Sequence, residues 1–432
     1  MQLTDWSSLS EEQQSALLQR PAVSQDAAIR ASTASIIAAV RDRGDAAVRE
    51  LTRDFDRAEL KNLKVQADEV EAANRQLSDR QRDAIDLAIS NVRAFHEAQR
   101  PLPIRVETMP GVVCERFSHA LDAVGLYVPA GTAPLPSAAI MLAVPASIAG
   151  CRTKVLCTPP RPDGTADPAV LVAATRSGVT DIFKIGGAQA IAAMAYGTES
   201  VPKVCKVFGP GNAYVTSAKS QVSGDPGGAA MDMPAGPSEV LVIADAGASA
   251  ELVASDLLSQ AEHGVDSQVV LVTPCKELAQ AVTRELDEQL ATLTRAAIAS
   301  EALQSSRIIV VPDLDTAVRV SNRYAPEHLI VQVDNPRQLL PDLRNAGSVF
   351  LGRWTPESVG DYCSGTNHVL PTYGFAQTYS GLGLDQFMRH MTVQELSKQG
   401  LENLGDAVIS LAGLEGLDAH AAAVSRRLSS PS

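Results

Sequence analysis

The sequence predicts an α/β fold with two domains, each built on a sheet of mainly parallel strands, and with helical segments at both ends of the chain. Two series of short β-rich runs alternate with helical patterns, and this repetition is typical of parallel sheets covered on both faces. A chain of 432 residues is also too long for one ordinary core, because domains hold roughly 100–200 residues. Two α/β domains are therefore expected.

The region from residue 24 to residue 100 is expected to be almost wholly helical. Isoleucine and valine recur there at helical spacings, with charged residues between them. A proline-rich connection with Pro101, Pro103 and Pro110 follows. No group of residues with catalytic chemistry stands out in this region.

The β-rich runs begin after this connection. The first series covers 124–128, 154–157, 181–185 and 206–208, and the second covers 240–243, 269–272, 308–311, 329–333 and 349–351. The segment 224–237 is the densest in glycine and proline, so the domain boundary is placed there. Beyond about residue 386 the pattern becomes helical again and ends in a polar tail.

Composition favours a cytoplasmic globular protein without nucleic-acid or membrane partners. The 37 basic and 50 acidic residues give a formal charge of −13, which disfavours a phosphate-backbone partner. The longest apolar stretch, 135–150, contains Pro145 and is shorter than the ~20 residues of a membrane span. The N-terminus lacks the regions of a secretory signal. The six cysteines form no Cys-x-x-Cys pair and are expected to be reduced.

Gln260 and His263 are the first candidate metal ligands. They belong to Ser-Gln-Ala-Glu-His-Gly at 259–264, which closes a predicted helix and places both side chains on one face. An ordinary helix end, with its histidine and glycine cap, explains the pair without metal chemistry. Asp361, in a predicted loop, and His420, near the C-terminus, are further candidates, although a turn cap and a solvent-facing position explain them as well. Such a set suits Zn²⁺ or Mn²⁺.

Glu327 and His328 form a candidate acid–base pair. They follow Pro326 and precede a predicted buried strand at 329–331, so they are expected at a strand edge. Histidine titrates near neutral pH, and a desolvated glutamate is shifted towards it. Adjacent residues of an extended chain point in opposite directions, so both reach one substrate only if the backbone turns. The alternative is one surface ion and one strand-edge histidine.

Glycine-rich turns follow two strands of the first series. Ile-Gly-Gly-Ala-Gln-Ala at 185–190 and Phe-Gly-Pro-Gly-Asn-Ala-Tyr at 208–214 each lead from a strand into a helix, as in strand-to-helix phosphate cradles. Neither turn matches G-x-G-x-x-G. Glycines also end strands for structural reasons, so these turns alone are weak evidence for a dinucleotide.

Seven segments match one enzyme family in order along nearly the whole chain. They are 124–129, 186–190, 209–212, 235–239, 259–264, 325–329 and 360–362. Together they resemble the histidinol dehydrogenases. The resemblance implies a zinc- and NAD-dependent enzyme of histidine biosynthesis, which oxidises L-histidinol to L-histidine through bound L-histidinaldehyde.

The resemblance also implies roles for individual residues. One Zn²⁺ per subunit is expected on Gln260, His263, Asp361 and His420. Glu327 and His328 are expected to be the catalytic acid–base pair, and Tyr127, Gln189 and Asn212 match positions that contact NAD⁺. Substrate contacts are expected at Ser238, Gln260, His263, His328, Asp361, Glu415 and His420.

The implied architecture has two Rossmann-like domains and helical terminal segments that serve dimerisation. Its parts are a helical segment at 1–23, a metal-binding and catalytic domain at 24–126 plus 238–382, an NAD-binding domain at 127–237, and a helical C-terminal segment at 383–432. The family forms a homodimer in which this last segment completes the partner's site. Glu415 and His420 are therefore expected to act across the interface.

In the implied mechanism zinc orients the substrate, His328 takes the alcohol proton during hydride transfer, and Glu327 later activates a water to attack the aldehyde. Two other functions remain open from the residues alone: a zinc hydrolase with Glu327 as base, and a metabolite-binding protein without catalysis. The role of His368, near Asp361, is open between a substrate contact and a loop hydrogen bond.

Overall fold

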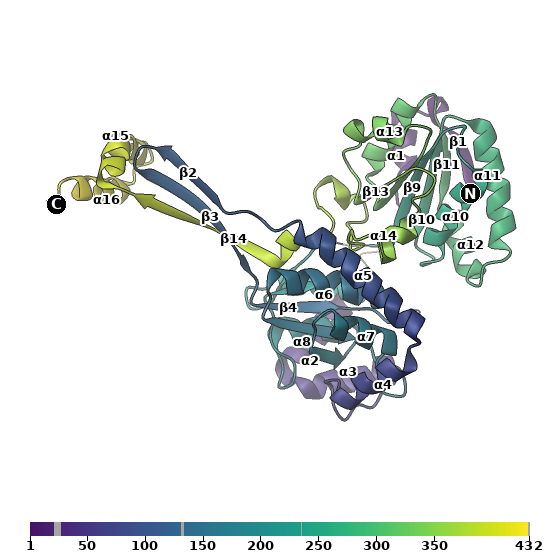
Figure 1. Cartoon of the computed structure of the whole chain (residues 1–432), viewed down its shortest axis with the longest axis horizontal. Helices are drawn as coiled ribbons and strands as arrows, with labels where there is room; N and C mark the ends of the chain where they lie inside the picture. Colours follow the sequence, from purple (N-terminus) through teal and green to yellow (C-terminus); the bar gives the residue numbers. More distant parts are fainter. Residues whose placement is uncertain (21–26, 131–133, 235, 431–432) are drawn as a thin grey trace.

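The computed structural model describes residues 1–20, 27–130, 134–234 and 236–430. Two α/β units lie beside each other, and an arm of antiparallel strands projects away from them (Figure 1). The predicted boundary between residues 23 and 24 falls outside the described residues. No helix in the described ranges is long and apolar enough to cross a membrane.

Six parallel strands form the sheet of one unit. In spatial order they are β1 (Gln2–Asp5), β11 (Arg307–Val310), β10 (Gln268–Thr273), β9 (Glu239–Ala244), β12 (His328–Gln332) and β13 (Ser348–Leu351). One face packs against α10 (Ala250–Ala261), α11 (Lys276–Leu290) and α12 (Ala296–Gln304), and the other against α13 (Leu314–Tyr324). Because both faces are covered, β9, β10 and β12 are buried along their whole length.

Five parallel strands form the sheet of the other unit. In spatial order they are β6 (Asp181–Lys184), β5 (Thr153–Thr158), β4 (Ala123–Tyr127), β7 (Lys206–Phe208) and β8 (Ala230–Met231). Helices α6 (Pro136–Ala149) and α7 (Pro168–Arg176) cover one face, and α8 (Gly187–Tyr196) and α9 (Ala213–Ser223) cover the other. The prediction of two α/β units with parallel sheets is confirmed.

The helices before residue 100 cover the five-stranded sheet, which corrects the predicted division into domains. Helices α2 (Ala27–Arg43) and α3 (Asp45–Asp56) share a core with α8 and α9, whereas α4 (Ala67–Gln76) and α5 (Asp79–Glu97) pack on α6 and α7. The prediction placed 24–126 with the catalytic sheet. It was wrong because apolar periodicity shows that a helix buries one face but does not identify what it covers.

The N-terminal segment begins with a strand where only helix was predicted. Strand β1 pairs in parallel with β11 at the edge of the six-stranded sheet, and the short helix α1 (Glu11–Leu17) follows it. Four residues are too few for a clear alternation of apolar and polar side chains, so the pattern gave no signal.

The C-terminal segment also contains a strand that was not predicted, and this strand lies within the arm. Strand β14 (Met388–Leu396) pairs antiparallel with β3 (Val112–Ala120), which pairs with β2 (Ile104–Met109). Most residues of β2 and β14 are exposed, so these strands lack the alternation of a half-buried strand. Helices α15 (Lys398–Leu414) and α16 (Asp418–Leu428) lie at the far end of the arm (Figure 1).

Candidate active site

A small cavity of about 70 Å³ lies between the two units. Its walls include Gly209 and Pro210 after β7, Ser238 before β9, Glu327 before β12, and His368. The carboxyl edge of the five-stranded sheet therefore faces the amino edge of the six-stranded sheet. Open α/β sheets usually bind ligands at the carboxyl ends of their strands. The six-stranded sheet differs, because it presents the amino ends of its strands to the cavity. This space is called the interdomain cavity below.

Glu327 and His328 lie at the start of β12, as the sequence predicts. Ala325 adopts a left-handed conformation with φ 52°, and Pro326 follows it, so the chain turns sharply before the strand. Both side chains are buried, and Oε2 of Glu327 lies 3.6 Å from Nδ1 of His328. The turn thus brings a carboxylate and an imidazole to one place.

The backbone of Glu239 holds both members of this pair. Its amide nitrogen donates to Oε2 of Glu327 at 2.8 Å, and its carbonyl oxygen lies 3.1 Å from Nδ1 of His328. A carbonyl only accepts, so Nδ1 carries a proton. Nε2 of His328 is buried, lies 3.4 Å from Oδ1 of Asp361 and has no hydrogen-bond partner among the described residues. Nε2 is therefore the ring atom open to a reactant.

The side chain of Glu239 is itself held by Arg20 from the N-terminal segment. The Arg20 guanidinium forms a two-pronged ion pair with the Glu239 carboxylate and donates to the carbonyl of Tyr324 at 2.7 Å. It also lies 4.0 Å from the centre of the Tyr324 ring. The amide of Tyr373 donates to the same carboxylate at 2.9 Å. A contact between residues far apart in sequence thus fixes the start of β9.

The predicted ligands Gln260, His263 and Asp361 lie at two helix ends. Gln260 is buried in the last turn of α10, and His263 is exposed just after it. Asp361 lies in the last turn of α14 (Glu357–Tyr362), not in the predicted loop. Six residues were too few for helical periodicity to reveal α14.

Charges around Asp361 show that it lies close to three histidines. Burial raises its pKa, but the neighbouring His328 and the charges of His368 and His263 outweigh burial, so the pKa is lowered. Asp361 is therefore an ionised carboxylate near both His263 and the catalytic pair. This position suits a residue that is predicted to contact both the metal and the substrate.

Glu357 is a site residue that the sequence analysis missed. It is buried and accepts from the hydroxyl of Ser259 at 2.7 Å; in the amide orientation that satisfies both groups, the nitrogen of Gln260 lies 2.8 and 2.9 Å from its two oxygens. This orientation of the amide leaves the oxygen of Gln260 for another partner. The four-residue spacing of Glu357 and Asp361 was the available signal, because it places both on one helix face.

Carboxyl groups surround the imidazole of His328 at the site. Burial, together with the charges of Asp361 and Asp256, raises the pKa of Glu357 to about 8, although His328 and the hydrogen bond from Ser259 oppose this rise. Burial lowers the pKa of His328, but Glu327, Asp361 and Glu357 outweigh it and raise this pKa well above its ordinary value. Several buried carboxyl groups around one imidazole fit a site that receives a cation.

A complete cation site is not formed by one chain. Within the described ranges, no three His, Cys, Asp or Glu side chains are grouped so that they could hold a metal ion. Gln260, His263 and Asp361 offer an amide oxygen, an imidazole and a carboxylate, donors that zinc accepts, and four ligands are its usual number. Glu415 and His420 are exposed at the far end of the arm, away from this site (Figure 1). The single chain therefore does not bring them to it.

Ser238 and His368 lie at the interdomain cavity with Glu327. Nδ1 of His368 is 2.8 Å from the carbonyl oxygen of Asp361, so this nitrogen carries a proton and the loop is tied to α14. Burial is the largest effect on His368 and lowers its pKa. The loop hydrogen bond is thus present, and the position at the cavity also allows a substrate contact.

The order β6-β5-β4-β7-β8 gives the five-stranded sheet a topological switch point between β4 and β7. From β4 the chain continues to β5 and β6 on one side, then crosses to β7 and β8 on the other. Dinucleotides bind at the carboxyl ends of strands at such a point. Tyr127 ends β4, and the turn Gly209–Asn212 follows β7. These predicted cofactor residues therefore lie where the topology places a nucleotide.

A buried ion pair fixes the turn after β7. Lys219 and Asp232 pair with each other, and both also hold Gly209: Lys219 donates to its carbonyl at 2.9 Å, and its amide donates to Asp232 at 2.8 Å. Gly209 has φ 119°, and a methyl group there would lie 2.1 Å from the carbonyl oxygen of Tyr127. Only glycine allows this approach of β7 to β4.

The three predicted cofactor residues differ in the hydrogen bonds that their side chains already make within the protein. The hydroxyl of Tyr127 accepts from the amide of Gly187 at 3.0 Å. Asn212 caps α9 through its side-chain oxygen. Gln189 is buried, and its Oε1 has no hydrogen-bond partner in the part of the chain that is described. Tyr127 and Gln189 both lie at the N-terminus of α8, whereas Asn212 begins α9.

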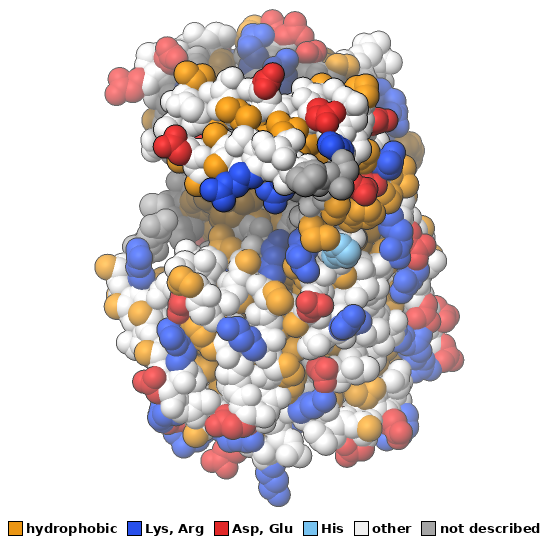
Figure 2. Space-filling view, turned by 90° about the vertical axis from the view of Figure 1, so that its left-hand side faces the viewer, with side chains coloured by type: hydrophobic (Ala, Val, Ile, Leu, Met, Phe, Trp, Pro, Cys, Tyr) orange, Lys and Arg blue, Asp and Glu red, His pale blue; other side chains and the backbone are white. Residues whose placement is uncertain are grey.

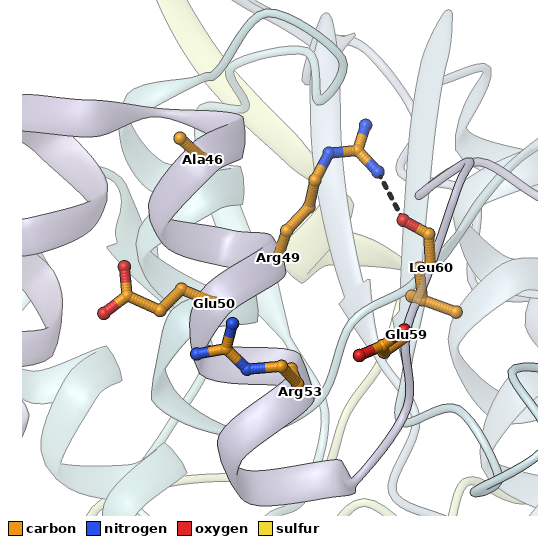
Figure 3. A pocket seen from close by; sticks show the side chains of 6 residues that line it. All are labelled: Ala46, Arg49, Glu50, Arg53, Glu59 and Leu60. Atoms are coloured by element: carbon orange, nitrogen blue, oxygen red, sulfur yellow. Dashed lines mark hydrogen bonds between the residues drawn. The ribbon is translucent and has the colours of Figure 1, made fainter.

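A broader depression of about 440 Å³ lies on α3 and the segment after it (Figure 3). Ala46, Arg49, Glu50, Arg53, Glu59 and Leu60 line it. Arg49 donates to the carbonyls of Leu60 and Lys61 at 2.9 and 2.8 Å, and Glu50 accepts from Arg43 at 2.6 Å. Because Arg49 and Glu50 already have partners and no predicted site residue lies here, the depression is not the candidate active site.

A parallel sheet with a topological switch point and a buried acid–base pair facing it are the features of an α/β enzyme. A family model described as histidinol dehydrogenase matches residues 18–428. The chain therefore belongs to the histidinol dehydrogenase family, and the resemblance inferred from the motifs is confirmed.

Similar proteins cover the chain almost completely. Histidinol dehydrogenase of Vibrio parahaemolyticus is 57% identical over 428 residues, which are 99% of this chain and 98% of that protein. The Escherichia coli enzyme is 54% identical over 426 residues, or 99% of this chain and 97% of that protein. The crystal structure of histidinol dehydrogenase from Elizabethkingia anophelis has a TM-score of 0.96 and 44% identity, and the match covers 99% of this chain and 98% of that one.

Proposed function

We propose that this chain is a zinc- and NAD-dependent histidinol dehydrogenase of histidine biosynthesis, which oxidises L-histidinol to L-histidine in two steps through bound L-histidinaldehyde. The observation that carries the proposal is the clamp of the Glu239 backbone on Glu327 and His328. It holds a carboxylate and an imidazole side by side and leaves one ring nitrogen open. Membership of the family supports the choice of substrate.

His328 is the general base of both oxidations. Each oxidation removes one proton and one hydride from the substrate, and NAD⁺, when bound, supplies the hydride acceptor. Because Nδ1 of His328 donates a hydrogen bond to the carbonyl of Glu239, Nε2 is the nitrogen that takes the hydroxyl proton. The negative surroundings that raise the pKa of His328 stabilise the imidazolium that forms when the ring takes this proton.

Glu327 serves the hydration between the two oxidations. Its carboxylate takes a proton from the water that adds to the aldehyde carbon, and the resulting gem-diol is then oxidised with His328 again as base. The amide of Glu239 keeps Oε2 in place at 2.8 Å. Two proton carriers thus serve two different steps, and the aldehyde stays bound between them.

Gln260, His263 and Asp361 would hold the zinc ion together with His420 of the partner subunit. When bound, this ion supplies positive charge and coordination positions that orient the amino and imidazole nitrogens of the substrate. Glu357 supports the site by orienting the amide of Gln260. Ser238 and Glu415 of the partner subunit would complete the contacts to the substrate.

The proposal includes a homodimer in which the arm carries Glu415 and His420 to the partner's site. At the end of the arm Leu411 and Leu414 are 61% and 85% exposed, and α16 has no buried residue. Exposed apolar groups of this kind are typical of protein contacts. Figure 2 views the molecule from the side of the arm. Hydrophobic side chains lie among charged ones on this face, and the surface is hollowed beneath the end of the arm.

Tyr127, Gln189 and Asn212 would contact NAD⁺ at the switch point of the five-stranded sheet. A cytoplasmic location is also part of the proposal, and the six unpaired cysteines support a reducing compartment.

The test is the stoichiometry of NADH formed per L-histidinol, measured with zinc-loaded protein and again after chelation. Two NADH per substrate, lost with zinc and restored on adding it back, are expected. If one NADH forms and the aldehyde is released, the proposed role of Glu327 in hydrating the aldehyde is wrong. If no NADH forms, the dehydrogenase function is rejected.

The shared site is tested by co-expressing two inactive variants, Asp361→Asn and His420→Asn. If each zinc site takes Asp361 from one chain and His420 from the other, mixed dimers contain one intact site, and part of the activity returns. Mixed dimers without activity would contradict the exchange of the arm.

A further inference from the structure

The turn Gly186-Gly187 at the N-terminus of α8 lies against a carboxylate from another element. A methyl group at Gly186 would lie 2.8 Å from Cγ of Pro159, just after β5, and 3.2 Å from Oδ1 of Asp56, the last residue of α3. The chain after α3 is fastened to β6, because Leu63 accepts from the amide of Lys184 at 2.8 Å. Asp56 is therefore held at the carboxyl edge of the five-stranded sheet.

Three buried oxygen atoms around this turn lack hydrogen bonds. They are Oδ2 of Asp56, Oε1 of Gln189 and Oγ1 of Thr158, and none has a partner among the residues described. Gln189 is only 1% exposed, and a methyl group at Gly187 would lie 2.8 Å from its Oε1. Buried polar atoms nearly always have partners in native proteins. A cluster of exceptions at a helix N-terminus indicates a missing ligand.

The chemistry of these atoms limits what the ligand can be. A carboxylate oxygen and an amide oxygen only accept hydrogen bonds, so the ligand must bring donors. A phosphate brings only acceptors and negative charge, and it would be repelled by Asp56. A vicinal diol brings two O–H donors. The burial that raises the pKa of Asp56 to about 6 agrees with a carboxylate that lacks its partner.

A nucleotide-binding sheet of this topology usually places such an acid at the end of its second strand, where it binds a ribose hydroxyl. Here the second strand is β5, and it ends in Thr158 followed by Pro159, without an acid. Asp56 arrives at the same edge from α3 instead. Because Asp56 comes from α3 and not from the end of β5, a search for the usual nucleotide-binding motif does not find it.

We propose that Asp56, together with Gln189, binds the 2′,3′-diol of the adenosine ribose of NAD⁺ and excludes NADP⁺. This inference rests on the proposed NAD-dependent function and adds its cofactor selectivity. The carboxylate accepts from the ribose hydroxyls, whereas the 2′-phosphate of NADP⁺ would remove a donor and place negative charge against it.

The strand order assigns this contact to the adenosine half of the cofactor. Gly209, which follows β7, lines the interdomain cavity together with Glu327, on one side of β4. Asp56 and Gly186 lie at β5 and β6, on the other side. Because the nicotinamide must reach the catalytic pair, the half of NAD⁺ that extends to Asp56 is the adenosine half.

The test is direct titration of NAD⁺, of its analogue lacking the adenosine 2′-hydroxyl, and of NADP⁺ into the full-length zinc-loaded protein. We expect Asp56→Asn and Asp56→Ala to weaken NAD⁺ binding about tenfold or more, as for a hydrogen bond to a charged group. The same variants should lose less affinity for the deoxy analogue than for NAD⁺, because the analogue keeps only one of the two ribose hydroxyls, and they should show a smaller preference for NAD⁺ over NADP⁺.

The matched control is Asp54→Asn, which changes an exposed carboxylate of the same helix that pairs with Arg53 at 2.9 Å. It should leave all three affinities unchanged. Thermal unfolding without cofactor should be the same or higher for Asp56→Asn, because an unpartnered buried charge is removed. NAD⁺ affinity within twofold of the parent, or an equal loss with the deoxy analogue, would overturn the inference. A parent that does not bind NAD⁺ would instead reject the proposed function.

Discussion

The side-chain amide of Gln260 faces the carboxylate of Glu357, and in the amide orientation that satisfies both groups its nitrogen lies 2.8 and 2.9 Å from the two oxygens. Glu357 also accepts from Ser259 at 2.7 Å, so it receives hydrogen bonds from two consecutive residues of α10. Asp361 lies four residues further along α14. One short helix thus supplies a candidate zinc ligand and the residue that orients another.

Loss of Glu357 is expected to weaken zinc binding without removing a ligand. In Glu357→Ala the amide of Gln260 loses its fixed orientation, and partners of this kind are worth about 10–100-fold in metal affinity. Zinc content after dialysis against graded concentrations of a chelator measures the effect. Glu251→Gln, an exposed change in the first turn of α10, is the control. Equal zinc retention in both variants would show that Glu357 does not support the metal.

Arg20 is expected to act on catalysis through Glu239. Arg20→Gln leaves the Glu239 carboxylate buried without its cation, which costs about 3–5 kcal/mol of stability, and the start of β9 loses a fixed point. Because small displacements of catalytic groups cost up to about 100-fold in rate, kcat should fall at least tenfold for both substrates, L-histidinol and added aldehyde. Zinc content and KM for the substrate should stay close to those of the parent.

Two further variants separate this positioning role from loosening of the N-terminal segment. Arg323→Gln removes an exposed contact of that segment with Ser15 but leaves Glu239 untouched, so kcat should not change. The double variant Arg20→Gln, Glu239→Gln removes both charges, and its stability should recover because no buried charge is left alone. A fall in kcat with Arg323→Gln equal to that with Arg20→Gln would reject the route through Glu239.

Sequence patterns located the elements that carry the site, but not the contacts that organise it. The helix end at Gln260 and the strand start at His328 follow from local periodicity, and the structure has both. The clamp on the catalytic pair comes from backbone atoms of Glu239, and residue types carry no information about backbone donors. Arg20 reaches Glu239 across 219 positions of the chain. Such a contact is set by the packing of the whole unit.

Glu327→Gln is expected to separate the two oxidations. The amide keeps an oxygen that accepts from the amide of Glu239, so the fold of the site should persist, but it does not take a proton from water. Oxidation of L-histidinol should stop after one NADH, and oxidation of added aldehyde should be slowed about 10²–10⁴-fold, the usual range for general base catalysis. Rapid-mixing measurements of NADH from each substrate check this. Equal slowing of both steps would mean that Glu327 does not act in hydration alone.

The hydrogen bonds of Asp45 predict a pH-dependent contribution to stability. Its carboxylate accepts from Thr198 at 2.6 Å and from the amide of Ser200 at 3.2 Å. Burial raises its pKa, but the bonds from Ser200 and Thr198 and the charge of Arg49 outweigh burial and lower it. A lowered folded pKa adds stability above the unfolded pKa of about 3.9, and this stability is lost as pH falls through the folded pKa.

Asp45→Asn should therefore cost about 1 kcal/mol of stability at pH 7, a modest value because the site is partly exposed. In urea denaturation at a series of pH values the difference from the parent should shrink below about pH 4, where the parent's own carboxylate becomes protonated. A difference that stays constant into acid would assign the loss to side-chain shape and not to charge.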